Sequence, residues 1–206
     1  MTHPLPRRLL VAITARAAVA TGCAVGERPT LEAADVITDP AGQAVVSRLD
    51  RPPTADFTAT YTITPTATST PTTATVTQRD GTVQTQIGEV VFTTDADGRT
   101  TTCAADGTDC EEQADDARVS DLGITHQFWS DSSRQRLATD AARRIGTSTG
   151  NTATIADRPA VCVAIKLPSS VETVGTVTYC ALEQGVLARY IGADSTIELT
   201  GFTADG

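Results

Sequence analysis

The stretch that decides the fold is residues 176–199, TVTYCALEQGVLARYIGADSTIEL, in which three apolar segments alternate with two turn sequences. If Gln184-Gly185 and Ala193-Asp194 form the turns, apolar side chains face one another across neighbouring strands. The aligned pairs are Tyr179 with Tyr190, Ala181 with Ala188, Tyr190 with Ile197, and Ala188 with Leu199. A shift of one residue would move all these side chains to the other face. Their agreement therefore predicts an antiparallel meander with one apolar face.

The segment before this stretch continues the same register. With Cys162 set opposite Cys180, the next facing pairs are Val163 with Tyr179 and Ile165 with Val177. These four side chains share one face, and both cysteines project from the other. The meander is thus expected over about residues 160–203.

Earlier segments show further strands. In DFTATYTIT, apolar residues alternate with polar ones; they are Phe57, Ala59, Tyr61 and Ile63. Asp80-Gly81 is expected to centre a hairpin that pairs Ala74 with Ile87, with Val76 and Val83 on the same side. Asp97-Gly98 is expected to centre the next hairpin. The Thr/Pro stretch TPTATSTP reads as a flexible loop, with a glycosylated patch as the alternative.

Two segments have helical patterns. One is Pro40–Leu49, before the first strand; the other is Asp131–Ile145, with Ser130 as a plausible N-cap and Gly146 at its end. The expected apolar stripe of the second is Leu137, Ala138, Ala141 and Ile145. Phe128 and Trp129 precede it and are expected to help cover the sheet. The predicted fold is α+β and mainly β, an antiparallel sheet packed on one or two helices.

The composition agrees with a β-rich fold and excludes one class of function, nucleic-acid binding. The 206 residues include 37 threonines, whose β-branched side chains favour strands, and 40% are apolar. The net charge is −9 and the pI about 4.6, so the chain lacks the basic surface of a nucleic-acid-binding protein.

The N-terminus resembles an export signal followed by a lipid-attachment site. Arg7 and Arg8 precede an apolar stretch and a run of small residues, so residues 1–22 are predicted to be a signal peptide. Ala20-Thr21-Gly22-Cys23 resembles the bacterial lipobox, with Ala20 where Leu is usual. Cys23 is therefore predicted to carry the lipid anchor, such as palmitate, and residues 23–39 to form the tether; the alternative is a free thiol after ordinary cleavage.

Export places the other four cysteines in an oxidising compartment, where disulfides form. In CAADGTDC, an Asp106-Gly107 two-residue turn sets Cys103 opposite Cys110 across a hairpin. The meander register likewise sets Cys162 opposite Cys180. Of the three possible connectivities, these two disulfides are predicted.

Taken together, the lipobox-like leader, the short helix before FTATY, the C-x6-C hairpin and the ending TYCALEQGVLARY resemble actinobacterial cell-envelope lipoproteins of the LolA/LppX-like superfamily. The resemblance covers most of residues 40–203, and residues 40–206 are predicted to be a single domain. It implies a curved half-barrel sheet over helices, with an apolar cavity between them that binds or carries a lipid. The candidate cavity residues are Phe57, Tyr61, Val76, Ile87, Val163, Ile165, Val177, Tyr179, Ile197 and Leu199.

No catalytic motif is present in the sequence. His126, in GITHQFW, has no nucleophile elbow beside it and reads as a surface or partly packed histidine. The acidic run 106–116 lacks calcium-loop spacing and reads as a solvated edge, and the cysteine spacings do not suit zinc. The chain is thus predicted to be a non-enzyme with no cofactor and no metal.

Two functions remain. The first is a lipoprotein, anchored to the cell membrane and facing the extracytoplasmic side, that binds an acyl chain or lipid in its cavity. The alternative is an interaction module with a solid core that docks on a cell-envelope protein through its acidic surface.

Overall fold

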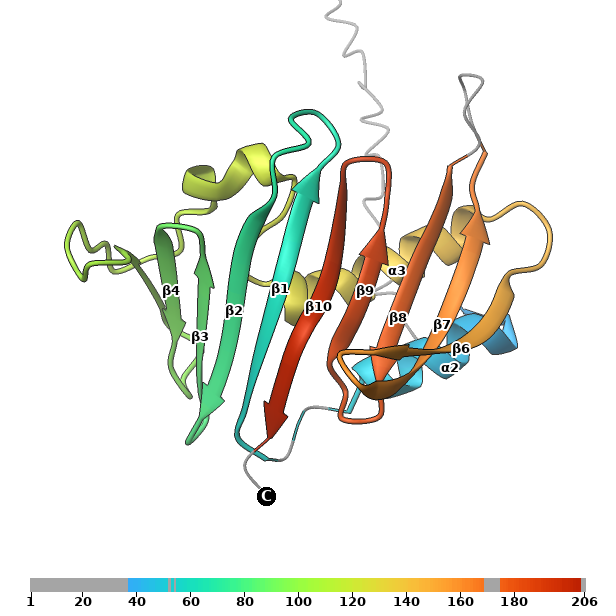
Figure 1. Cartoon of the computed structure of the whole chain (residues 1–206), viewed down its shortest axis with the longest axis horizontal. Coiled ribbons are helices and arrows are strands. Elements are labelled where there is room, and N and C mark those ends of the chain that lie inside the picture. The colour runs from blue at the N-terminus through green and yellow to red at the C-terminus, as the bar shows by residue number, and fades with distance from the viewer. Residues whose placement is uncertain (1–36, 52, 54, 169–174, 205–206) are drawn as a thin grey trace, which may run out of the picture. The chain divides into compact units, whose positions relative to one another are not determined.

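The computed structural model describes residues 37–51, 53, 55–168 and 175–204, and its ten strands form one antiparallel sheet (Figure 1). The strands are β1 (Phe57–Pro65), β2 (Thr72–Arg79), β3 (Thr82–Ile87), β4 (Val90–Thr94), β5 (Thr100–Ala104), β6 (Thr149–Ile155), β7 (Arg158–Lys166), β8 (Thr176–Leu182), β9 (Leu187–Ile191) and β10 (Ser195–Ala204). The helical elements are α2 (Pro40–Leu49), the 3-10 helix η1 (Asp116–Leu122), the π-helical turn η2 (Phe128–Ser132) and α3 (Ser133–Arg143).

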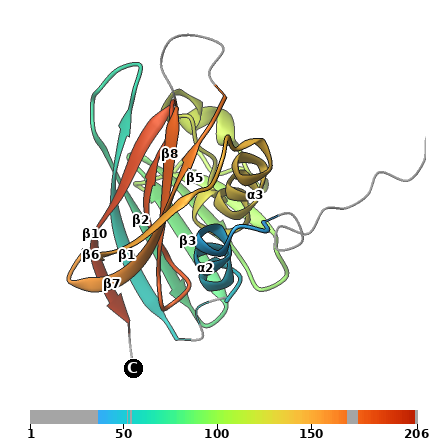
Figure 2. The same ribbon diagram turned by 90° about the vertical axis from the view of Figure 1, so that its right-hand side faces the viewer.

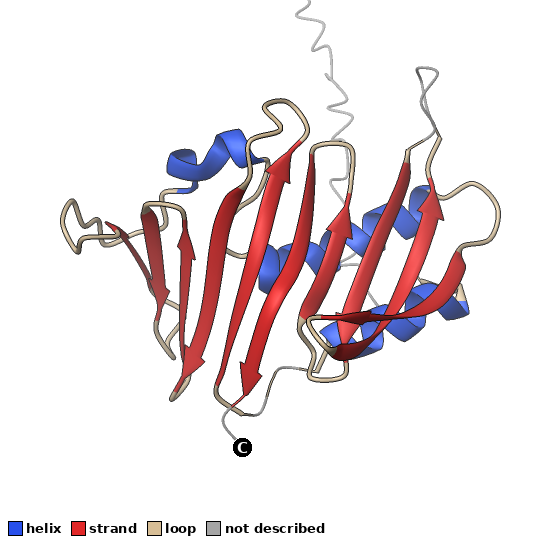
Figure 3. Ribbon diagram, viewed as in Figure 1, coloured by secondary structure: helices blue, strands red, loops and turns tan. Residues whose placement is uncertain are grey.

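The strand order, β5-β4-β3-β2-β1-β10-β9-β8-β7-β6, joins two meanders through the pairing of the first strand with the last. The sheet is open and curved, and α2 and α3 lie on one of its faces (Figure 2). The predicted α+β, mainly β class is confirmed. Figure 3, read with the labels of Figure 1, shows that α2 and α3 lie behind the β7–β10 half of the sheet, whereas the short helix η1 lies towards the β2–β4 end.

The register of the C-terminal meander agrees with several of the predicted pairs, whereas the predicted pair Ala188 with Leu199 is not among the paired residues of β9 and β10. Cys162 pairs with Cys180, Tyr179 with Tyr190, and Tyr190 with Ile197. The predicted pairing of Ala181 with Ala188 is wrong, because a bulge after Cys180 pairs Ala181 with Leu187. Its cause is the turn: Leu182 N–H donates to Val186 O, so three residues form the loop instead of two.

Gly185 closes this turn in the left-handed region, with φ of 79°. The turn lies directly against the chain that follows α2, since a Cβ on Gly185 would lie 1.9 Å from the backbone oxygen of Arg51. A side chain at this position would therefore force the turn away from α2.

The Asp-Gly turns differ from one another. Asp80 and Gly81 both have positive φ, as a type I′ turn requires, and Ala74 pairs with Ile87 as predicted. At Asp106-Gly107 only the glycine has positive φ, and Ala104 N–H donates to Thr108 O across a three-residue loop. The predicted two-residue turn is thus wrong there, although the strand register beyond it returns to the predicted one, with Thr102 bridged to Glu111.

The first helix is confirmed, and the second is shorter than predicted. Asp39 caps α2 by accepting a hydrogen bond from Gly42 N–H at 2.9 Å. The helix predicted over Asp131–Ile145 is α3, which begins at Ser133 after a kink at Ser130 and ends at Arg143. Ile145 is therefore not part of the buried stripe: its side chain is 56% exposed and its N–H donates to the Lys166 carbonyl of β7.

Two polar contacts join α3 to the sheet. The hydroxyl of Tyr179 on β8 donates to Asp140 Oδ2 at 2.6 Å, and both side chains are buried. Arg136 pairs with Asp194, which also accepts a hydrogen bond from the Tyr190 hydroxyl at 3.0 Å. Burial and the contact with Asp140 raise the pKa of Tyr179, which keeps its hydroxyl a donor.

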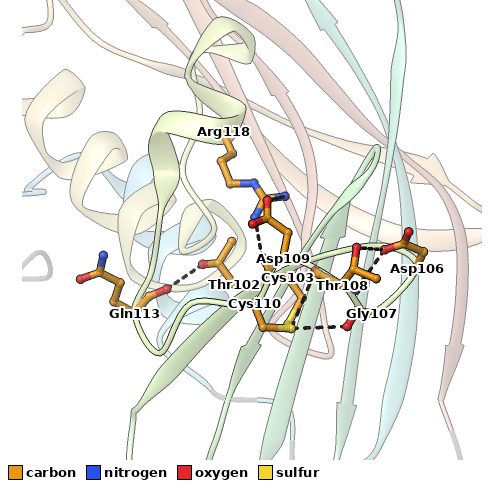
Figure 4. Close-up of a disulfide and its surroundings, with 9 residues drawn as sticks. All are labelled: Thr102, Cys103, Asp106, Gly107, Thr108, Asp109, Cys110, Gln113 and Arg118. Carbon is orange, nitrogen blue, oxygen red and sulfur yellow. Dashed lines mark hydrogen bonds and ion pairs between the residues drawn. A yellow bond between two sulfur atoms is a disulfide. The ribbon is translucent and has the colours of Figure 1, made fainter.

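Both predicted disulfides are present. Cys162–Cys180 joins β7 to β8 inside the sheet, and both cysteines are buried. Cys103–Cys110 closes the exposed hairpin after β5 (Figure 4). There, the backbone segment that follows the hairpin is held by Thr102, whose hydroxyl donates to Gln113 O and accepts from Asp115 N–H.

Candidate functional site

A cleft of about 370 Å³, lined by both apolar and polar side chains, lies over β1–β3. Its floor is formed by strand residues and its walls by the end of α2, the β8–β9 turn and the η2–α3 segment. The lining residues are Leu49, Asp50, Pro53, Phe57, Tyr61, Val76, Gln78, Val83, Thr85, His126, Trp129, Ser130, Asp131, Arg134, Gly185 and Val186. The volume falls within the range of small-molecule sites.

Aromatic side chains shape the middle of the cleft. Tyr61 is fully buried in the floor, and its hydroxyl donates to the backbone oxygen of Leu187 at 2.9 Å. Burial raises the pKa of Tyr61, so this hydrogen bond persists at all ordinary pH values. The Trp129 ring lies 5.3 Å from the Tyr61 ring, centroid to centroid. Its indole nitrogen is buried and has no hydrogen-bond partner in the part of the chain that the structure describes.

Charged side chains stand at the rim of the cleft. Arg134, near the start of α3, contacts Asp50 at 2.9 Å and Asp131 at 3.0 Å. Asp50 is the C-cap residue of α2, so its ion pair with Arg134 joins the two helices across the cleft. All three side chains are partly exposed to solvent, and their summed formal charge is −1.

His126 occupies the wall between the cleft and a polar hollow on the other side. Its Nδ1 lies 2.9 Å from the Asp116 carboxylate, and its ring stacks on Phe92. The side chain is only 9% exposed, so it is a packed histidine held by a carboxylate.

The predicted cavity residues divide into two groups. Phe57, Tyr61 and Val76 line the cleft. The other seven are buried but do not line it; they are Ile87, Val163, Ile165, Val177, Tyr179, Ile197 and Leu199. On the β7–β9 side, α2 and α3 pack against the sheet and fill the space that the half-barrel expectation left open.

Several lining residues were not predicted from the sequence. Leu49 and Asp50 come from the end of α2, and Val186 from a turn, so the period of the strands does not point to them. Trp129 was predicted to cover the sheet, and its position before the α3 pattern was the available signal. No feature of the sequence marked Arg134 as a lining residue, because a charged residue on a helix usually faces solvent.

Cys23, the leader and most of the tether lie outside the described residues. Among the residues that the structure does describe, no helix has the length and hydropathy to cross a bilayer. The same residues contain no group of three or more His, Cys, Asp or Glu side chains placed to hold a metal ion.

Comparison with known proteins yields structural matches only. No protein-family model matches the chain, and no curated protein does. Among solved structures, MucB is similar at 14% identity and a TM-score of 0.45 over 80% of this chain. MucB in complex with MucA(peri) is similar at 13% identity and a TM-score of 0.44 over 80% of this chain. The Pseudomonas aeruginosa MucA/MucB complex is similar at 14% identity and a TM-score of 0.42 over 81% of this chain. The chain spans 55–59% of the length of those chains.

Proposed function

We propose that this protein is a non-catalytic lipoprotein of the LolA/LppX-like type that binds a hydrophobic ligand, an acyl chain, in the cleft between β1–β3 and the η2–α3 segment. Cys23 carries the lipid that anchors it to the cell membrane, and the folded unit faces the extracytoplasmic side. The observation that carries the proposal is the cleft itself, a cavity of about 370 Å³ whose lining includes Phe57, Tyr61 and Val76.

The nature of the lining supports an apolar ligand. Phe57, Val76, Val83 and Val186 present only hydrocarbon, and a chain lying on them would gain about 0.8 kcal/mol for each methylene removed from water. The charged side chains at the rim, Asp50, Asp131 and Arg134, are partly exposed, as expected of a site that holds an amphiphile by its chain. Two disulfides accord with an oxidising, extracytoplasmic compartment.

Trp129 provides a direct assay, because it is the only tryptophan of the chain and lies in the cleft wall. The full chain carrying Cys23→Ser, purified oxidised and without detergent, is titrated with decyl amphiphiles below micelle-forming concentrations. A saturable change in tryptophan fluorescence is expected. A chain that shows no binding, with a native mass equal to that of the bare protein, would support the docking-module alternative.

Two valines on neighbouring strands provide matched variants. Val83 on β3 lines the cleft, whereas the pairing of Val91 with Gln86 places Val91 of β4 on the opposite face, and both are partly buried. Val83→Phe fills the cleft and is expected to weaken binding at least tenfold, while Val91→Phe leaves it unchanged. Equal effects of the two substitutions would place the ligand elsewhere.

The anchor is tested separately by metabolic labelling with an alkyne-bearing fatty acid. The wild-type chain, expressed in a lipoprotein-forming bacterium, is expected to incorporate the label and to fractionate with membranes. Cys23→Ala is expected to abolish both. Retention of the label in this variant would refute the assignment of Cys23.

A further inference from the structure

The cleft has a size and a charge pattern that limit which amphiphile it accepts, and this inference rests on the proposed function. If each methylene takes roughly the 30 Å³ that a water molecule occupies in the liquid, the cleft holds about a dozen heavy atoms. A cleft of about 370 Å³ therefore suits one chain of medium length, not two.

Arg134 is the one Arg or Lys side chain among the described residues that line the cleft, and it already pairs with two carboxylates. One terminal nitrogen of Arg134 donates to Asp50 at 2.9 Å and the other donates to Asp131 at 3.0 Å, so these bonds pair its charge with two carboxylates and use two of its five N–H donors. An anionic head group that bound the remaining donors of Arg134 would lie beside both carboxylates, and the three side chains together carry a net formal charge of −1.

The carboxylates, in contrast, retain capacity for donors. Each carboxylate has about four lone-pair sites, and Arg134 uses one oxygen of Asp50 and one of Asp131. Asp131 is 63% exposed at the side chain and Asp50 is 33% exposed, so a bound head group can reach both. Behind the cleft wall, Asp116 adds further negative charge beside His126.

We infer that the cleft selects a single-chain amphiphile whose head group donates hydrogen bonds and bears no negative charge, with Asp50 and Asp131 as the specificity-determining residues. A hydroxyl-bearing head and an ammonium head share this chemistry. Fatty acids and alkyl phosphates are disfavoured by the rim.

Three probes with the same tail test the inference in the Cys23→Ser full chain: decyl glucoside, decylamine and decanoate, followed by Trp129 fluorescence at neutral pH. Decyl glucoside and decylamine are expected to bind at least tenfold more tightly than decanoate, the order expected for one like charge a few Å away in partly screened surroundings. Tighter binding of the amine than of the glucoside would show that charge dominates, and equal binding that hydrogen bonding does. Both results support the inference.

Asp131→Asn removes one negative charge from the rim and one ion pair of Arg134. The affinity for decanoate is then expected to lie within about threefold of the affinities for the other two probes. Asp121→Asn, an exposed acid on η1 outside the cleft lining, is the matched control and should leave the ratio unchanged. Decanoate binding as tightly as the other probes to the Cys23→Ser chain would overturn the inference and leave the proposed acyl-chain function intact. So would a ratio that Asp131→Asn does not change. Failure of all three probes would instead refute the proposed function.

Discussion

Replacing Tyr179 with Phe tests the polar contact between α3 and the sheet. The substitution keeps the buried ring and removes only the hydroxyl, which lies 2.6 Å from the carboxylate of Asp140. Because Asp140 is 9% exposed, water replaces the lost donor poorly. A hydrogen bond to a charged group contributes about 1.5–3 kcal/mol, so the free energy of unfolding is expected to fall by that amount.

Tyr190→Phe is the matched control. It also removes a tyrosine hydroxyl bound to a carboxylate, that of Asp194. Asp194, however, keeps the Arg136 guanidinium and the N–H of Ser195 as donors, so no acceptor is left alone. The expected loss is about 1 kcal/mol or less.

Urea denaturation of both variants gives the comparison. The midpoint should shift while the slope stays constant, since neither variant changes the surface exposed on unfolding. By heat, Tyr179→Phe should lower the melting temperature by about 3–12 °C for a chain of this size. If Tyr179→Phe costs no more than Tyr190→Phe, the contact with Asp140 does not hold α3 on the sheet.

Five further substitutions have expected costs in the free energy of unfolding, which equilibrium denaturation can measure. Cys162→Ser removes the disulfide with a sequence separation of 18 residues and should cost about 3 kcal/mol. Cys103→Ser removes the disulfide with a separation of 7 residues and should cost about 2.5 kcal/mol. An unchanged free energy of unfolding after reduction of the protein would contradict both values. Gly98 has a φ of 78° and no atom near the position of a Cβ, so Gly98→Ala should cost about 1 kcal/mol. Gly185→Ala should cost at least about 3 kcal/mol, because its Cβ would meet the backbone that follows α2. Similar costs for the two substitutions would contradict the packing of the β8–β9 turn against that backbone. Leu137 lies on α3 and is fully buried, so Leu137→Ala should cost about 2–5 kcal/mol; a loss below about 1 kcal/mol would mean that α3 does not cover a core.

The register of the sheet could be predicted from the sequence because it depends on local alternation. Tyr179, Tyr190 and Ile197 can share a face in only one alignment, and the structure has that alignment. The helix at 40–49 was equally predictable, from its proline at the first position and its aspartate cap. These features depend on residues that are close in the chain.

The details of turns were less predictable. Asp80-Gly81 and Asp106-Gly107 have the same dipeptide, yet only the first forms a two-residue turn. The difference arises from the neighbouring contacts, such as those of Thr102 with the returning segment, which the dipeptide does not encode.

The candidate site depended on tertiary structure most of all. The sequence by itself determined the β-rich class, the apolar face, the two disulfide pairs and the existence of two helices that could cover that face. It could not determine which half of the face the helices would cover, because that depends on contacts such as Asp140 with Tyr179, 39 residues apart. These contacts pack the helices over β7–β10, and Phe57, Tyr61 and Val76 line the cleft beside that layer together with Trp129 and Arg134, so the cleft results from where the helices pack.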